Sequence, residues 1–211
     1  MKLTLPMCEL IGAVVGDANL HDKRPYYVEF CLNPAEDREY VLTRLLPIVK
    51  QELDYSPTLF EREGGLRFRI NNKKFVEWLK ALDIPSGKGK CYEVVIPEAI
   101  IAGGWESVRA CIRGIVDTDG CVFFDLRPSY ISPYPRIVFH MSSHKLLLQL
   151  RELLQSRFKV SLSSRKESLW LNGKLMVQEF LRSIGFSNPR HLRKIRRHYP
   201  AYLELNRDSA T

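Results

Sequence analysis

Apolar and polar residues follow two spacings along this chain, and the same succession of spacings occurs twice. Apolar residues three or four positions apart predict helices, and strict alternation of apolar with polar residues predicts strands with one buried face. In the first half, the predicted helices cover residues 5–18 and 72–82 and a segment that begins at Pro34. The predicted strands cover residues 19–21, 26–32, 59–62 and 66–71. We expect Pro47 to kink the middle helix, because proline cannot donate a helical hydrogen bond.

The second half repeats this order. Its predicted helices cover residues 107–119, 143–158 and 173–184, its predicted strands cover residues 121–126, 136–141, 159–163 and 169–171, and a basic segment follows at 190–197. An offset of 102 residues links Asp17 with Asp119 and also Trp78 with Phe180. A chance match of two acids would not bring the third helix into the same register. The pattern therefore predicts an α+β protein of two pseudo-symmetric αββαββα units, with an N-terminal subdomain at 1–103 and a C-terminal subdomain at 104–211.

Several predicted strands carry apolar residues on one face and basic or hydrogen-bonding residues on the other. Phe68 and Ile70 point to one side, and Arg67 and Arg69 point to the other. Such a face suits a sheet that lies along a DNA groove, although a solvated sheet face has the same pattern. The residues that we expect to contact DNA on these faces are Arg24, Tyr26, Glu29, Arg67, Arg69, Asn71, Arg127, Tyr134, Arg136, His140, Ser161 and Arg165.

Charge and cysteine content narrow the class of protein. The net charge of +8 favours a polyanionic partner, with nucleic acid ahead of an anionic membrane surface. No apolar run approaches the length of a membrane span, so no membrane partner is expected. Five cysteines without metal-binding spacing predict reduced, mostly buried thiols. These features predict an intracellular protein, in the cytoplasm or nucleoid of a prokaryote or in an organelle, and not a secreted one.

Two apolar stretches, at 10–18 and 112–120, contain small residues four positions apart and an acid near their end. Gly12 and Gly16 lie on one face of a helix, which allows a second helix to approach closely. Asp17 and Asp119 fall in the last turn of their helices, where the helix dipole disfavours a carboxylate. Two helices that both end in this way suggest a cation between the acids. Asp117 is interpreted as structural, because its counterpart in the repeat is Val15.

Both stretches resemble the nine-residue motif of the LAGLIDADG homing endonucleases. The second copy follows the family pattern closely, and the first departs from it at Val15 and Ala18. The segments 87–90 and 184–190 also resemble segments of the archaeal-type members with two motifs. The resemblance covers nearly the whole chain and implies that two sheets form a continuous saddle-shaped surface. It further implies a monomeric, intron-encoded endonuclease that cuts both strands of a long asymmetric DNA duplex and leaves short 3′ overhangs.

The resemblance also implies a set of catalytic residues. Asp17 and Asp119 are expected to bind Mg²⁺, with the backbone carbonyls of Gly16 and Thr118 as additional ligands. Mn²⁺ is expected to substitute for Mg²⁺, and Ca²⁺ is expected to bind without supporting cleavage. Family members keep a basic residue near each scissile phosphate, and the repeat nominates Lys88 and Arg190 for this role, with Lys90 as a near neighbour. These three basic residues complete the predicted catalytic set.

Two other functions remain open at this point. The same scaffold could bind its own intron RNA as a splicing maturase, which needs the basic surface but not the acids. It could also bind DNA without cutting it. An acid at the eighth position of both motifs argues against either function in a pure form, but it is compatible with a nuclease that also acts as a maturase.

Overall fold

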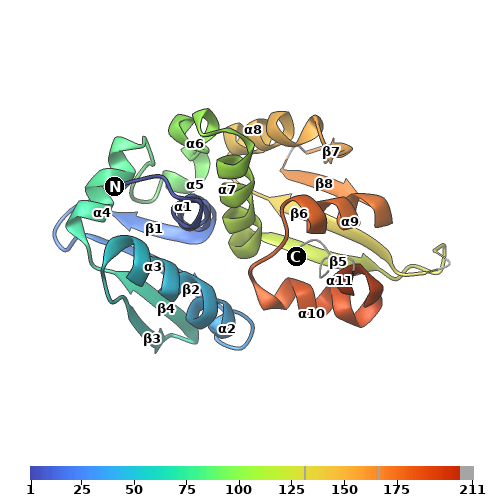
Figure 1. Cartoon of the computed structure of the whole chain (residues 1–211), viewed down its shortest axis with the longest axis horizontal. Helices are drawn as coiled ribbons and strands as arrows, with labels where there is room; N and C mark the ends of the chain where they lie inside the picture. Colours follow the sequence, from blue (N-terminus) through green and yellow to red (C-terminus); the bar gives the residue numbers. More distant parts are fainter. Residues whose placement is uncertain (131, 166, 205–211) are drawn as a thin grey trace.

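The computed structural model describes residues 1–130, 132–165 and 167–204, and it contains the predicted repeat (Figure 1). The first unit consists of α1 (Leu5–Asp17), β1 (Ala18–His21), β2 (Tyr27–Leu32), α2 (Arg38–Tyr40), the π-helical turn η1 (Val41–Leu45), α3 (Leu46–Leu53), β3 (Thr58–Arg62), β4 (Gly65–Ile70) and α4 (Lys73–Ala81). The second consists of α7 (Gly104–Asp119), β5 (Gly120–Asp125), β6 (Tyr134–His140), α8 (His144–Gln155), β7 (Val160–Leu162), β8 (Ser168–Asn172) and α9 (Lys174–Ser183). The short helices α5 (Lys90–Glu93) and α6 (Glu98–Ala102) join the units, and α10 (Pro189–His198) and α11 (Ala201–Glu204) follow the second.

The middle helix of the first unit starts later than predicted and contains a π-helical turn. It begins at Arg38 rather than at Pro34, because the side chain of Asn33 accepts hydrogen bonds from the backbone of Ala35 and Glu36 and holds a turn. The kink expected at Pro47 stays a prediction. The π-helical turn η1 directly precedes α3, and Pro47 lies in the first turn of α3, where a helical hydrogen bond from its nitrogen is not needed.

Helices α1 and α7 pack against each other along most of their length, and α1 is buried on every side from Met7 to Val15. A Cβ atom on Gly12 would lie 1.9 Å from the carbonyl oxygen of Cys111, and one on Gly114 would lie 2.0 Å from that of Glu9. Neither position has room for any side chain. The small residues predicted from the sequence therefore let the two backbones touch, and this contact joins the two units.

The two units contain antiparallel sheets of matching topology, with strand orders β1-β2-β4-β3 and β5-β6-β8-β7. In each sheet one face is buried beneath helices, as Phe68 and Ile70 on β4 and Ile137 and Phe139 on β6 illustrate. Figure 1 shows the helices in front of the sheets, with one sheet on each side of α1 and α7. Within the described ranges, the residues on the opposite faces of β2, β4 and β6 are half-buried or exposed.

The two helices of the repeated motif leave in extended conformation. Ala18 has φ −89° and Gly120 has φ −97°, so neither exit uses a left-handed residue. The replacement of glycine by Ala18 in the first motif therefore causes no backbone strain. The glycine of the second motif answers a packing requirement instead, because a Cβ on Gly120 would lie 2.4 Å from the side chain of Val116.

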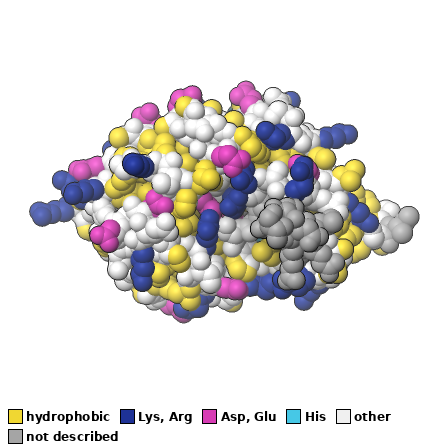
Figure 2. All heavy atoms as spheres, viewed as in Figure 1, with side chains coloured by type: hydrophobic (Ala, Val, Ile, Leu, Met, Phe, Trp, Pro, Cys, Tyr) yellow, Lys and Arg dark blue, Asp and Glu magenta, His cyan; other side chains and the backbone are white. Residues whose placement is uncertain are grey.

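The surface on the helix side mixes both signs of charge with apolar groups, and Lys and Arg side chains gather near α10 (Figure 2). Among the described residues, no helix is long and apolar enough to cross a membrane. The prediction of mostly buried cysteines is wrong. Cys8 and Cys111 are buried, but Cys31 and Cys91 are exposed and Cys121 is half-buried.

Candidate active site

The last residues of α1 and α7 are the two acids singled out in the sequence, and both are exposed to solvent. The helix contact continues to this point, since a Cβ on Gly16 would lie 2.3 Å from the hydroxyl oxygen of Thr118 and 3.4 Å from the Cβ of Asp119. Asp17 and Asp119 are thus close neighbours across the boundary between the units. Asp117, by contrast, is fully buried and accepts a hydrogen bond from the backbone of Ser187, which agrees with a structural role.

The surroundings of the two acids raise their pKa values. Protein atoms around Asp17 reduce its hydration, and this effect, followed by the negative charge of Asp119, raises its pKa to about 7. Reduced hydration also raises the pKa of Asp119, which the charge of Lys90 partly opposes. Both carboxylates are accessible at the surface, but neither is as well hydrated as a carboxylate on an open surface. A divalent cation beside them would stabilise their ionised forms and lower both pKa values.

The structure separates the roles of Lys88 and Lys90. Lys88 is exposed in the loop before α5, whereas Lys90 is only 6% exposed and its Nζ donates a hydrogen bond of 3.1 Å to the carbonyl oxygen of Val15. Burial lowers the pKa of Lys90 to about 8, against the opposing influence of Asp17 and then Asp119. A pocket of about 230 Å³ is lined by Gly16, Asp17, Ala18, Asn19, Gly87, Lys88, Lys90 and Cys91. Lys90 therefore hydrogen-bonds to the end of α1, while Lys88 lines the same pocket from the exposed loop.

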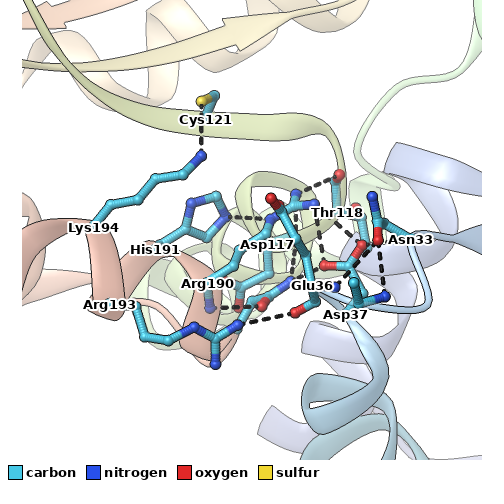
Figure 3. A network of polar contacts seen from close by, with 12 residues as sticks. Asn33, Glu36, Asp37, Asp117, Thr118, Cys121, Arg190, His191, Arg193 and Lys194 are labelled. Atoms are coloured by element: carbon cyan, nitrogen blue, oxygen red, sulfur yellow. Dashed lines mark hydrogen bonds and ion pairs between the residues drawn. The ribbon is translucent and has the colours of Figure 1, made fainter.

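Arg190, at the start of α10, binds the end of α7 (Figure 3). Its Nη2 donates hydrogen bonds of 3.0 and 2.9 Å to the carbonyl oxygens of Asp117 and Thr118. Its Nη1 forms an ion pair of 3.1 Å with Asp37, which is only 2% exposed and belongs to the first unit. Asn188 donates to both Asp37 and the carbonyl of Asp117. Neither α1 nor α7 has a basic residue in its own last turn, so cations from distant segments satisfy the carbonyl ends of both helices.

The donor atoms at the helix ends suit a hard divalent cation. Mg²⁺ binds through one or two carboxylates and keeps water or phosphate oxygens as its other ligands. Within the described ranges, no group of three or more His, Cys, Asp or Glu side chains is placed to hold a metal. Of the two backbone carbonyls predicted as further ligands, that of Thr118 already accepts a hydrogen bond from Arg190. The two carboxylates are therefore better placed as ligands than the Thr118 carbonyl.

Most of the residues predicted to contact DNA lie on the open faces of the sheets or in the loops at their edges. Arg67 and Arg69 lie on the open face of β4, opposite its buried residues, and Tyr134, Arg136 and His140 do so on β6. The exposed ones are Arg24, Asn71, Arg127, His140, Ser161 and Arg165, and Glu29 is half-buried on the open face of β2. Tyr26 is an exception, because its side chain packs against the core. Strand alternation places Tyr27 on the open face instead, where it stacks on His21.

Some residues of this region were missed by sequence reasoning. Asp37 contacts both Asn188 and Arg190, which lie more than 150 residues away in the sequence. Asn188 and Arg190 are neighbours in one turn. No local sequence pattern predicts these contacts. Tyr27 and Asp125 could have been found, because each shares the parity of open-face residues on its own strand. Asp125 accepts hydrogen bonds from Arg127 and Arg136 on the open face of the second sheet.

The chain is similar to a known domain family in sequence and to solved structures in fold. Residues 106–199 match the sequence model of the LAGLIDADG-like domain. No curated protein matches the chain. Among solved structures, I-DmoI in complex with DNA and Mn is similar over 87% of this chain and 98% of its own, with a TM-score of 0.56 and 16% identity. I-WcaI bound to its DNA recognition sequence is similar over 94% and 87%, with a TM-score of 0.59 and 15% identity.

The N-terminal LAGLIDADG domain of DUF199/WhiA is similar over 88% of this chain and 83% of its own, with a TM-score of 0.55 and 14% identity. Identities this low establish the fold and not the activity. The domain match includes the second of the two nine-residue stretches, and the shared fold extends the resemblance over most of the chain. The C-terminal half of this chain carries a LAGLIDADG-like domain, and the two halves together have the fold of the single-chain LAGLIDADG homing endonucleases.

Proposed function

We propose that this protein is a site-specific endonuclease that hydrolyses both strands of a DNA duplex. One observation carries the proposal: two exposed carboxylates, Asp17 and Asp119, end two helices in direct contact, with a cationic side chain bound at each helix end. Structural stability alone gives no reason for acids at the carbonyl ends of both helices. Support also comes from the similar structures, which include I-DmoI with DNA and Ca and I-WcaI with its recognition sequence.

The substrate that fits is a long, asymmetric duplex. The open sheet faces present arginine, tyrosine and asparagine side chains, which hydrogen-bond to base edges in the major groove. The two subdomains, 1–103 and 104–211, differ in sequence and would contact unlike half-sites, so a monomer suffices for an asymmetric target. By the family resemblance, the cuts leave short 3′ overhangs, and the gene lies in a mobile intron.

The proposed chemistry is hydrolysis at phosphorus. A water oxygen bonds to phosphorus, the bond to the 3′ oxygen breaks, and that oxygen leaves with a proton. Asp17 and Asp119, with the carbonyl of Gly16, would hold Mg²⁺, which when bound activates water and stabilises the leaving oxygen. Lys90 places a positive charge beside both acids and offsets charge at the phosphate. Arg190 holds the carbonyl end of α7 and so fixes the position of Asp119.

The test is cleavage of a plasmid library with random inserts, in Mg²⁺, followed by sequencing of the cut ends. We expect Asp17→Asn and Asp119→Asn each to lower double-strand cleavage by about 10²–10³-fold or more. Glu179→Gln is the matched control, because this acid pairs with Arg182 on the exposed side of α9. The same assay in Mn²⁺ and in Ca²⁺ tests the prediction that Mn²⁺ supports cutting and Ca²⁺ only binding.

Three results would contradict the proposal. Cleavage at the full rate in both variants would remove the acids from the reaction. Tight binding of a duplex without cutting in any metal would indicate a DNA-binding protein. Binding of intron RNA that is tighter than binding of any duplex would indicate a maturase.

A further inference from the structure

The open face of the first sheet holds an arginine in a fixed orientation. Arg69 lies on β4 and faces Glu29 on β2, its directly paired residue in the neighbouring strand. Both strands are interior to the sheet, whose order is β1-β2-β4-β3. The pair therefore lies on the two interior strands and not on an edge strand. The floor of a DNA groove that runs along the sheet would meet the interior strands.

Three contacts orient the guanidinium of Arg69. Its Nε donates a 2.5 Å hydrogen bond to a carboxylate oxygen of Glu29. Its central carbon lies 4.6 Å from the ring centre of Tyr27 and 5.5 Å from that of Phe60. The rings and the carboxylate hold the planar group from its faces and from its Nε, so it loses little conformational entropy when it binds.

These contacts leave the outer edge of the guanidinium available. Within the part of the chain that the structure describes, neither Nη1 nor Nη2 of Arg69 donates to a protein acceptor, and the side chain is 30% exposed. Two parallel N–H donors on a planar group match the O6 and N7 acceptors of guanine in the major groove. Arg136 on the second sheet differs, because its Nη1 donates to Asn172 and its Nη2 to Asp125 and Tyr130.

We propose that Arg69 reads one guanine of the target and that Glu29 is the positioning residue that makes this contact specific. The inference rests on the proposed DNA-binding function and adds a residue-level account of specificity to it. A phosphate contact fits the geometry less well, because the carboxylate of Glu29 lies beside the guanidinium and repels phosphate. Arg67 also lies near Glu29, with 3.8 Å between Nη1 and the second carboxylate oxygen.

The experiment is selection of bound duplexes from a randomised library without divalent metal, followed by sequencing. We expect the wild-type protein to enrich sites with guanine at one fixed position. Glu29→Gln should reduce the preference for that guanine about tenfold and should leave affinity for unselected duplex equal or about twofold higher, because a negative charge is lost. Arg69→Lys keeps the charge but loses the planar pair of donors, so it should also lose the preference for guanine and keep its affinity for unselected duplex.

A modified base gives a second readout. Replacement of that guanine by 7-deazaguanine removes N7 and should weaken wild-type binding about tenfold, with little effect on Arg69→Lys. Glu179→Gln serves as the control acid, and melting curves check that each variant is folded. If Glu29→Gln and Arg69→Lys weaken all duplexes equally and keep the base preference, Arg69 contacts phosphate and the inference is wrong. If the wild type enriches no duplex, the proposed function itself is wrong.

Discussion

The carbonyl ends of α1 and α7 meet the same electrostatic problem in different ways. At the end of α1, the single ammonium of Lys90 donates to Val15 from a short helix of its own unit. At the end of α7, the guanidinium of Arg190 donates to Asp117 and Thr118 and also pairs with Asp37 of the other unit. A lysine that makes one such contact can reorient toward substrate, whereas an arginine with several is held in place.

This comparison shows where a repeat stops being a guide. Arg190 lies 71 residues after Asp119, and the residue 71 positions after Asp17 is Lys88. The lysine that makes the equivalent contact is Lys90, which lies 73 residues after Asp17. The loops before the two contacts differ by two residues, so equal spacing and equivalent contact point to different side chains. Equivalent carbonyls identify the pair, since Val15 and Asp117 are 102 residues apart like the two acids.

The largest effect is expected from the choice between the two lysines. Lys90→Met should lower the cleavage rate by about 10²–10³-fold, because it removes a buried positive charge beside both acids. Lys88→Met should change the rate by about twofold at most, because Lys88 is exposed and its charge is well hydrated. Single-turnover cleavage of a selected site measures both. Equal losses in the two variants would support Lys88, the lysine nominated by the repeat spacing, as a catalytic residue.

The contact between the units should respond next most strongly. Gly12→Ala places a Cβ 1.9 Å from a backbone oxygen of α7, so we expect a loss of about 3 kcal/mol in the free energy of unfolding. Helix propensity favours alanine by only about 1 kcal/mol, and the clash outweighs it. Gly89→Ala is the control, since nothing lies near its Cβ position. Urea unfolding measures both, and an unchanged Gly12→Ala protein would contradict the close helix contact.

A smaller effect is expected where Arg190 crosses between the units. Asp37→Asn removes the carboxylate that pairs with a largely buried guanidinium, and we expect a loss of about 2 kcal/mol. Arg38→Gln is a neighbouring control, because Arg38 and its partner Glu61 form an exposed pair worth less than about 1 kcal/mol. Equilibrium unfolding distinguishes the two. Equal stabilities would mean that the pair with Asp37 contributes nothing to the joint between the units.

The last effect, which accumulates with pH and is smallest per pH unit, concerns the residue after each cation. This residue is an exposed Cys91 in one unit and a buried His191 in the other. Burial, and then the charges of Arg190 and Lys194, lower the pKa of His191 to about 3. The native protein keeps His191 neutral while the unfolded chain binds a proton below pH ~6.5. His191 therefore lowers stability as pH falls from ~6.5 toward 3, by up to about 1.4 kcal/mol per pH unit.

Unfolding of wild type and His191→Gln at several pH values between 4 and 7 measures this contribution. Unfolding of the wild type below pH ~6.5 takes up one proton at His191, and unfolding of the variant does not. We therefore expect the stability of the variant to fall less steeply as the pH is lowered. The difference in stability between the two proteins at pH 7, where His191 is largely neutral in both states, gives the direct effect of the substitution. Identical slopes for the two proteins would show that His191 is not held neutral in the fold.

Residue periodicity predicted most of the fold but placed some features imprecisely. Tyr26 is predicted on the open face, whereas Val28 and Phe30, which have the same parity on this strand, are buried. The start of the middle helix was placed too early, because the side chain of Asn33 holds a turn at 33–37. Both errors lie at element boundaries, where side-chain hydrogen bonds compete with the backbone pattern.

By itself, the sequence determined the two units, their helices and strands, and the pair of acids that ends equivalent helices. Those properties depend on the spacing of apolar residues and on the constant offset between the two repeats, and both can be read from the sequence. Tertiary structure alone decided that Lys90 rather than Lys88 meets the end of α1, that Asp37 holds Arg190, and that Arg69 is oriented by Glu29. Each of these contacts joins residues 40 or more positions apart, and their meeting depends on how loops close and strands pair.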